Sequence, residues 1–185
     1  MHHDLTLNPT SLSAAGTYNI GTDPNSGNGN FSSFGDNTSG SGNMMIINGT
    51  TTTGTISWGQ TVNVIAGQTY SFNIWLANLF PGGAAALDLV VDGVVVNSAT
   101  TNATTSNANS GFWNEFTGDW LATVDGAIDL QVIETSAAFG GNDYGLDDIS
   151  FTTEIAPVSS VPLPAGLPLL LAGLGALGIA RRTRR

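Results

Sequence analysis

Apolar and polar residues alternate along short segments from residue 55 onward. In residues 68–79 (QTYSFNIWLANL), every second residue from Tyr70 to Leu76 is large and apolar, whereas Ser71, Asn73 and Trp75 lie between them. Residues 55–65 (TISWGQTVNVI) alternate in the same way. Because neighbouring side chains of a strand point to opposite faces of a sheet, this period of two predicts half-buried β-strands.

Further segments have the composition of strands. Two valine-rich runs in residues 86–98 are joined by Asp92-Gly93, which is a strong signal for a β-hairpin. Residues 44–48, 111–124 and 127–135 are also rich in apolar, β-branched or aromatic residues. In the last such segment, residues 143–153, the alternation slips by one residue at Asp147-Asp148, which predicts a β-bulge.

These segments predict an all-β protein, with seven or eight short antiparallel strands in a β-sandwich over residues 1–155. No part of that range has a convincing helical period. Residues 5–43 are rich in Gly, Ser, Asn and Thr, and we expect an ordered loop region anchored by Phe31 and Phe34. Residues 156–162 are rich in Pro and Ser, which indicates an extended linker.

The end of the chain has a different pattern. From Leu163 to Ala180 every residue is apolar, Gly or Pro, and four arginines follow: Arg181, Arg182, Arg184 and Arg185. A helix of roughly 18 residues is about 27 Å long, close to the ~30 Å hydrocarbon core of a membrane. Arginine clusters stay on the cytoplasmic side. The pattern therefore predicts a single transmembrane helix over residues 163–180, with the sandwich outside and the tail 181–185 inside.

Charge is distributed very unevenly along the chain. The 185 residues include 14 Asp and Glu and only four Lys and Arg, for a net charge of −10. Because the four basic residues are the terminal arginines, residues 1–180 contain all 14 carboxylates and no Lys or Arg. Such a surface repels nucleic acid and anionic lipid. The absence of cysteine excludes disulfides, zinc–thiolate sites and cysteine nucleophiles.

The order of Pro-rich motif, short apolar helix and arginine tail resembles the PEP-CTERM class of bacterial sorting signals, in its VPLPA variant. The motif matches residue for residue at Val161, Pro162, Leu163, Pro164 and Ala165. The resemblance covers residues 161–185. It implies recognition by an exosortase, a membrane transpeptidase that cuts near the motif and passes its substrate to the cell surface or to extracellular polysaccharide. It therefore implies an exported protein of the bacterial cell envelope, associated with a biofilm matrix.

Two segments of the sandwich region, GNDYGLDDISF and GQTYSFNIWLAN, resemble jelly-roll domains of the galactose-binding or carbohydrate-binding-module type. The resemblance implies a jelly-roll arrangement of the predicted strands. Such domains commonly begin with an Asn-Gly-x-Phe-Glu strand after a signal peptide, and neither precedes residue 15 here. We therefore expect the reading frame to extend upstream of Met1 through one more strand and a signal peptide.

Catalytic chemistry has little support in the sequence. His2 and His3 are the only histidines and are expected to lie at a frayed terminus. Glycoside hydrolysis requires two carboxylates across a sugar bond, for which Glu115 and Glu134 are the candidates. We expect no enzymatic activity. The favoured hypothesis is a non-enzymatic surface protein, the alternative is a glycan-recognising carbohydrate-binding module, and a glycoside hydrolase comes third.

Two binding sites are predicted. Asp143, Asp147 and Asp148, with Asn142, crowd one segment and offer the oxygen ligands that calcium prefers, so a structural Ca²⁺ is the one cofactor considered. The resembling domains often hold a calcium ion at this strand. Trp75 lies on the polar face of its strand, where an exposed indole stacks on sugars. The other three tryptophans, Trp58, Trp113 and Trp120, are further candidates.

Overall fold

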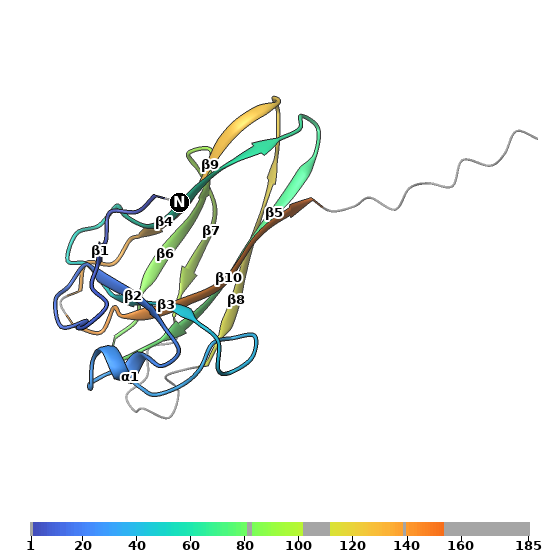
Figure 1. Cartoon of the computed structure of the whole chain (residues 1–185). Helices are drawn as coiled ribbons and strands as arrows, with labels where there is room; N and C mark the ends of the chain where they lie inside the picture. Colours follow the sequence, from blue (N-terminus) through green and yellow to red (C-terminus); the bar gives the residue numbers. More distant parts are fainter. Residues whose placement is uncertain (1, 81–82, 102–111, 139, 154–185) are drawn as a thin grey trace, which may run out of the picture. The chain divides into compact units, whose positions relative to one another are not determined.

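The computed structural model describes residues 2–80, 83–101, 112–138 and 140–153. The chain divides into two units after Glu154, and all described residues belong to the first unit. That unit is a β-sandwich of two sheets (Figure 1). The prediction of an all-β sandwich is confirmed, whereas the membrane-spanning helix predicted for residues 163–180 lies outside the described residues. Among the residues that are described, no helix is long and apolar enough to cross a membrane.

One sheet has six strands in the order β1-β2-β3-β10-β5-β8. Its strands are β1 (Thr6–Leu7), β2 (Thr17–Gly21), β3 (Met44–Asn48), β10 (Tyr144–Thr153), β5 (Thr69–Asn78) and β8 (Asn114–Leu121). All its pairs are antiparallel except β1–β2. The other sheet has the antiparallel order β4-β9-β6-β7, with β4 (Thr55–Val64), β9 (Gly126–Glu134), β6 (Ala86–Val91) and β7 (Val94–Thr100). The only helix in the described ranges is the single turn α1 (Pro24–Gly27), which Asp23 caps.

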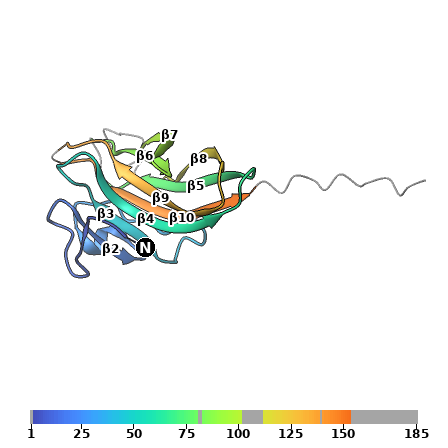
Figure 2. The same cartoon turned by 90° about the horizontal axis from the view of Figure 1, so that it is seen from above.

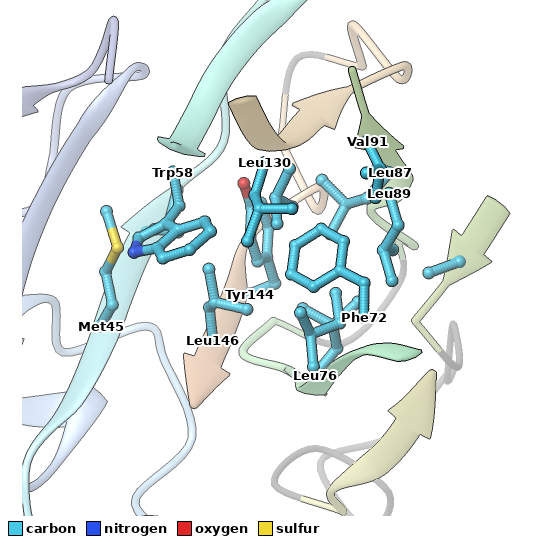
Figure 3. Close-up of a cluster of buried hydrophobic side chains, with 14 of the residues drawn as sticks. Met45, Trp58, Phe72, Leu76, Leu87, Leu89, Val91, Leu130, Tyr144 and Leu146 are labelled. Atoms are coloured by element: carbon cyan, nitrogen blue, oxygen red, sulfur yellow. The ribbon is translucent and has the colours of Figure 1, made fainter. Parts of the chain in front are cut away.

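The main core lies between the two sheets (Figure 3). Phe72, Ile74 and Leu76 of β5 are fully buried in it, as the alternation predicts. Opposite them lie buried leucines and valines of β6 and β9, among them Leu89 and Leu130. Each such side chain contributes roughly 1.5–3 kcal/mol when it is fully removed from water. This core fixes which side of each strand faces inward and which faces out.

A second, smaller core covers part of the outer face of the six-stranded sheet. Met44 and Ile46 of β3 face outward there and are buried under residues from the N-terminal half of the chain. Phe31 is 3% exposed, and Phe34 packs on the edge of the same cluster, so both predicted anchors are confirmed. We call residues 22–43 the covering segment. Figure 2 shows this part of the chain, in blue, along one flank of the sandwich.

Both predicted backbone irregularities are present. Asp92 and Gly93 have φ values of 50° and 76°, and they join β6 to β7 with Val91 opposite Val94. This is the left-handed conformation that a tight hairpin turn requires. In β10 the pairing with β5 shifts between Asp147 and Ser150, and Asp148 has a φ of 45°. The sequence therefore predicts both the hairpin and the bulge correctly.

The N-terminal residues are more ordered than the sequence predicts. His2 pairs with Gly59 of β4 through a backbone bridge. The His3 ring packs edge-on against Tyr18, with 4.8 Å between ring centroids and 2.9 Å between its Nε2 and the Tyr18 hydroxyl oxygen. The expectation of a frayed terminus is therefore wrong for His2 and His3. Their ring and backbone contacts connect the start of the chain to both sheets.

Candidate functional site

The four tryptophans have very different surroundings. Trp58 is 6% exposed and belongs to the main core. Trp120 packs on that core beside Tyr70, and Trp113 packs on the second core, with its indole N–H donating to the Gly35 carbonyl at 3.1 Å. Trp75 is half-buried and belongs to neither core. Of the four candidates, Trp75 is the one whose indole lies on the outer face of the sheet outside both cores.

Carboxylates and an amide surround Trp75 on the outer face of the six-stranded sheet. In the strand register, Trp75 lies directly opposite Glu115 of β8 and Asp147 of β10. Side chains in such opposite positions have Cβ atoms only about 4.5–5.5 Å apart. Asn73 lies two residues before Trp75 in β5, on the same face. Its amide donates to the Glu115 carboxylate and, at 2.9 Å, to the Thr117 hydroxyl. We call Asn73, Trp75, Glu115, Thr117 and Asp147 the Trp75 face.

A loop of the covering segment forms one boundary of the Trp75 face. The backbone N–H of Asn37 donates to the Asp147 carboxylate at 2.9 Å, and the Asn37 amide donates to Asp148 at 2.8 Å. The Thr38 hydroxyl also donates to Asp148, at 2.7 Å. The bulge therefore turns two consecutive carboxylates toward the same loop. These contacts hold Asp147 in place beside Trp75.

The same loop is organised around Asp36. Its carboxylate accepts from the backbone N–H groups of Gly42 at 2.7 Å and Ser39 at 3.1 Å, and from the Ser39 hydroxyl at 2.9 Å. Burial acts to raise the pKa of Asp36, but these hydrogen bonds outweigh it and lower the pKa below 3.8. The ionised carboxylate is thus the form that this loop conformation favours.

The three aspartates predicted to bind calcium are not gathered into one cluster. Asp143 is 5% exposed and accepts from the Gly49 N–H at 3.1 Å, whereas Asp147 and Asp148 accept from Asn37 and Thr38. In the described ranges no group of three or more His, Asp or Glu side chains could hold a metal ion. Calcium binding stays a prediction. A melting temperature that calcium fails to raise would count against it.

The two glutamates considered for glycoside hydrolysis belong to different sheets and face different surroundings. Glu115 is exposed on the outer face of β8. Glu134 ends β9, is 1% exposed, and faces the interior, where it accepts from the Thr50 N–H at 2.8 Å and the Tyr144 hydroxyl at 3.0 Å. Burial is the main cause that raises the pKa of Glu134, and the nearby Asp143 raises it further. This arrangement gives Glu134 a place in a buried hydrogen-bond network and no common sugar-binding surface with Glu115.

A pocket of about 280 Å³ lies at the end of the sandwich where β3, β5 and β9 finish. Several loops line it, and its wall includes two phenyl rings, three asparagines and Asp143: Phe31, Phe80, Asn28, Asn30, Asn48 and Asp143. We call it the end pocket. It shares no residue with the Trp75 face. The sequence does not predict it, because its residues come from separate loops and have no common spacing.

Comparisons with known proteins concern the fold. No protein-family model and no curated protein matches the chain. Among solved structures, the chain is similar to an apo form cyclase from Fischerella sp., with a TM-score of 0.53 and 12% identity over 84% of this chain and 88% of the other. This likeness supports a shared sandwich fold.

Carbohydrate-binding proteins are also among the structural neighbours. The C-terminal domain of EclA, a sugar-binding protein, has a TM-score of 0.46 and 19% identity, over 54% of this chain and 68% of its own. The CBM22-1 xylan-binding domain of Paenibacillus barcinonensis Xyn10C has a TM-score of 0.43 and 14% identity, over 78% and 91%. Both TM-scores are below that of the cyclase, and the β-sandwich predicted from the sequence is confirmed by the two sheets of the structure itself.

Proposed function

We propose that this protein is a non-enzymatic carbohydrate-binding protein of the cell surface, and that a glycan chain lies along the Trp75 face. The observation that carries the proposal is the position of Trp75. Trp75 is the one tryptophan of four that belongs to neither core. In the sheet it lies between Glu115 and Asp147, on an otherwise polar face. A half-buried aromatic ring beside polar groups is typical of a recognition surface.

The chemistry of the Trp75 face suits a sugar chain. The apolar C–H face of a sugar ring stacks on an indole, while its hydroxyls donate to carboxylates such as Glu115 and Asp147. Thr117 adds a hydroxyl that both donates and accepts. Residues 1–180 contain no Lys or Arg to pair with a sulfate or uronate. We therefore expect neutral or amino-bearing glycans and not polyanionic ones.

The test is binding of soluble neutral polysaccharides, such as xylan, β-glucan and galactan, by isothermal titration calorimetry. We expect Trp75→Ala to weaken binding about 30-fold, as truncation of a central aromatic residue commonly costs ~2 kcal/mol. The control is Ile65→Ala, because Ile65 is 64% exposed in the connection between β4 and β5 and does not belong to the Trp75 face. The proposal is overturned if no glycan of the panel binds, if both variants bind like the parent, or if the parent releases sugar fragments catalytically.

We further propose that the C-terminal tail delivers the sandwich to the surface. The apolar residues 163–180 and the VPLPA motif at residues 161–165 support an exosortase-type system and passage to extracellular polysaccharide. Replacing all four arginines, Arg181, Arg182, Arg184 and Arg185, by Ser should scramble orientation or abolish anchoring, because basic residues set topology. The measurement is protease accessibility of residues 1–160 in whole cells. Unchanged topology in the Ser variant would contradict the sorting-signal hypothesis.

A further inference from the structure

The end pocket is small and rich in hydrogen-bond acceptors. Its volume of about 280 Å³ lies near the lower limit of ligand pockets, roughly 300–1,000 Å³, so it suits one ring and not a chain. The NH₂ groups of Asn28 and Asn48 both donate to the Leu12 carbonyl, at 3.0 and 2.7 Å. Each amide thereby uses one of its two N–H groups, and the Asn28 oxygen also accepts from the Asn30 N–H at 3.1 Å. The amides can still accept hydrogen bonds from a ligand through their oxygen atoms, and each keeps one N–H to donate.

The pocket also has a buried carboxylate in its wall, with no Lys or Arg beside it among the described residues. The Asp143 carboxylate is almost fully buried and accepts from the Gly49 N–H. The buried Glu134 carboxylate lies close enough to interact with it electrostatically. The described residues contain no Lys or Arg, and His2 and His3 contact Gly59 and Tyr18 instead. Burial raises the pKa of Asp143, while backbone hydrogen bonds from Gly49 and Gly141 oppose that rise. A positive group on a ligand would stabilise the ionised carboxylate further.

Two aromatic rings complete the wall. Phe31 and Phe80 both line the pocket, but Phe31 is buried in the second core, so the half-buried Phe80 supplies the accessible ring face. A phenyl ring favours both the C–H face of a sugar and a nearby cation. A ligand that satisfies every group must donate hydrogen bonds, carry a positive charge and present an apolar ring face. An anion fails on charge, and an N-acylated sugar lacks the positive group.

We propose that the end pocket binds a single sugar ring with a free amino group, its ammonium beside Asp143 and its ring against Phe80. The proposal deepens the proposed function, since it names the class of sugar that a second site selects. It rests on carbohydrate binding in general and not on the Trp75 face. The two sites share no residue, so each can fail without the other.

The test is titration of the full chain with glucosamine, glucose and N-acetylglucosamine, followed by ¹H–¹⁵N NMR and calorimetry. We expect glucosamine to bind at least about tenfold more tightly than the other two sugars, which is a common contribution of a charged hydrogen bond. The amide signals of Gly49 and Gly141, which line the pocket, should shift with glucosamine. Equal binding of the three sugars, or shifts confined to other regions, overturns the proposal.

Variants separate a specific site from simple charge attraction. Asp143→Asn should remove the preference for glucosamine, whereas Asp129→Asn removes one exposed carboxylate of β9 and should leave it unchanged. Phe80→Ala removes a half-buried ring and should weaken glucosamine binding about fivefold. This variant tests the pocket if Asp143→Asn does not fold. Ile65→Ala, which lies outside both the end pocket and the Trp75 face, should bind glucosamine like the parent. If Asp129→Asn loses as much affinity as Asp143→Asn, or if Phe80→Ala binds like the parent, the pocket is not the site.

Discussion

Two tryptophans on the same outer face of the six-stranded sheet have different surroundings. Trp113 lies over Gly145 of β10, where an added Cβ atom would come within 3.0 Å of its ring. It packs edge-on against Phe34, with 5.9 Å between ring centroids. Trp75, opposite Asp147 two residues further along β10, has no such cover from the second core. One half of the face is therefore part of the folded core, and the other half, where Trp75 is half-buried, lies outside it.

The covering segment creates this difference. It contains few apolar residues, yet Phe31 and Phe34 are enough to hold it on β3. Its loop then stops at the bulge, where Asn37 and Thr38 donate to Asp147 and Asp148. A polar segment thus covers a sheet face only as far as its aromatic anchors reach. Where a bulge supplies carboxylates, the cover ends and a polar surface begins.

The largest expected effect comes from removing a core residue under the cover. Ile46 is fully buried between β3 and the covering segment, so Ile46→Ala should lower the free energy of unfolding by about 2–5 kcal/mol. Ile20 of the adjacent β2 is 54% exposed, and Ile20→Ala should cost less than about 0.5 kcal/mol. Urea unfolding measures both. Equal losses in the two variants would show that the covering segment does not pack as a core.

Much of the sandwich could be predicted because its strands bury one face only. The alternation in β5 correctly placed Phe72 inside and Trp75 outside, and the slip at Asp147-Asp148 correctly predicted the bulge. Period-two patterns of this kind report burial directly. β1 and β2 were missed, because their residues lie in a Gly, Ser and Asn-rich stretch whose strand signal is weak. Tertiary pairing with β3, and not local propensity, makes them strands.

The sites were less predictable than the fold. Four tryptophans looked equivalent in the sequence, and only the positions of the two cores separate Trp75 from Trp58, Trp113 and Trp120. Asp143 looked like a partner of Asp147, yet it is held instead by the Gly49 N–H at the end pocket. Such contacts join residues about a hundred positions apart, and no local spacing encodes them.

A smaller effect should follow from the carboxylate that organises the loop of the covering segment. The pKa of Asp36 is lowered below 3.8, so its contribution to stability is present above pH 3.8 and is lost as pH falls through the lowered value. Asp36→Asn cannot ionise and loses acceptors for Gly42 and Ser39. The variant should therefore be less stable than the parent at pH 6. This difference should shrink as the pH is lowered below 3.8. Urea unfolding between pH 2.5 and 6 checks it.

Glu134 supplies the matched comparison, because its titration has the opposite sign. Burial raises the pKa of Glu134 above its ordinary 4.5, so the folded state holds this proton more tightly than the unfolded state does. Its contribution to stability should therefore fall as pH rises from 4.5 through the raised pKa. Glu134→Gln lacks this titration, so its stability relative to the parent should increase with pH over that window. If Asp36→Asn and Glu134→Gln show the same pH slope, overall charge and not the two local environments governs the acid response.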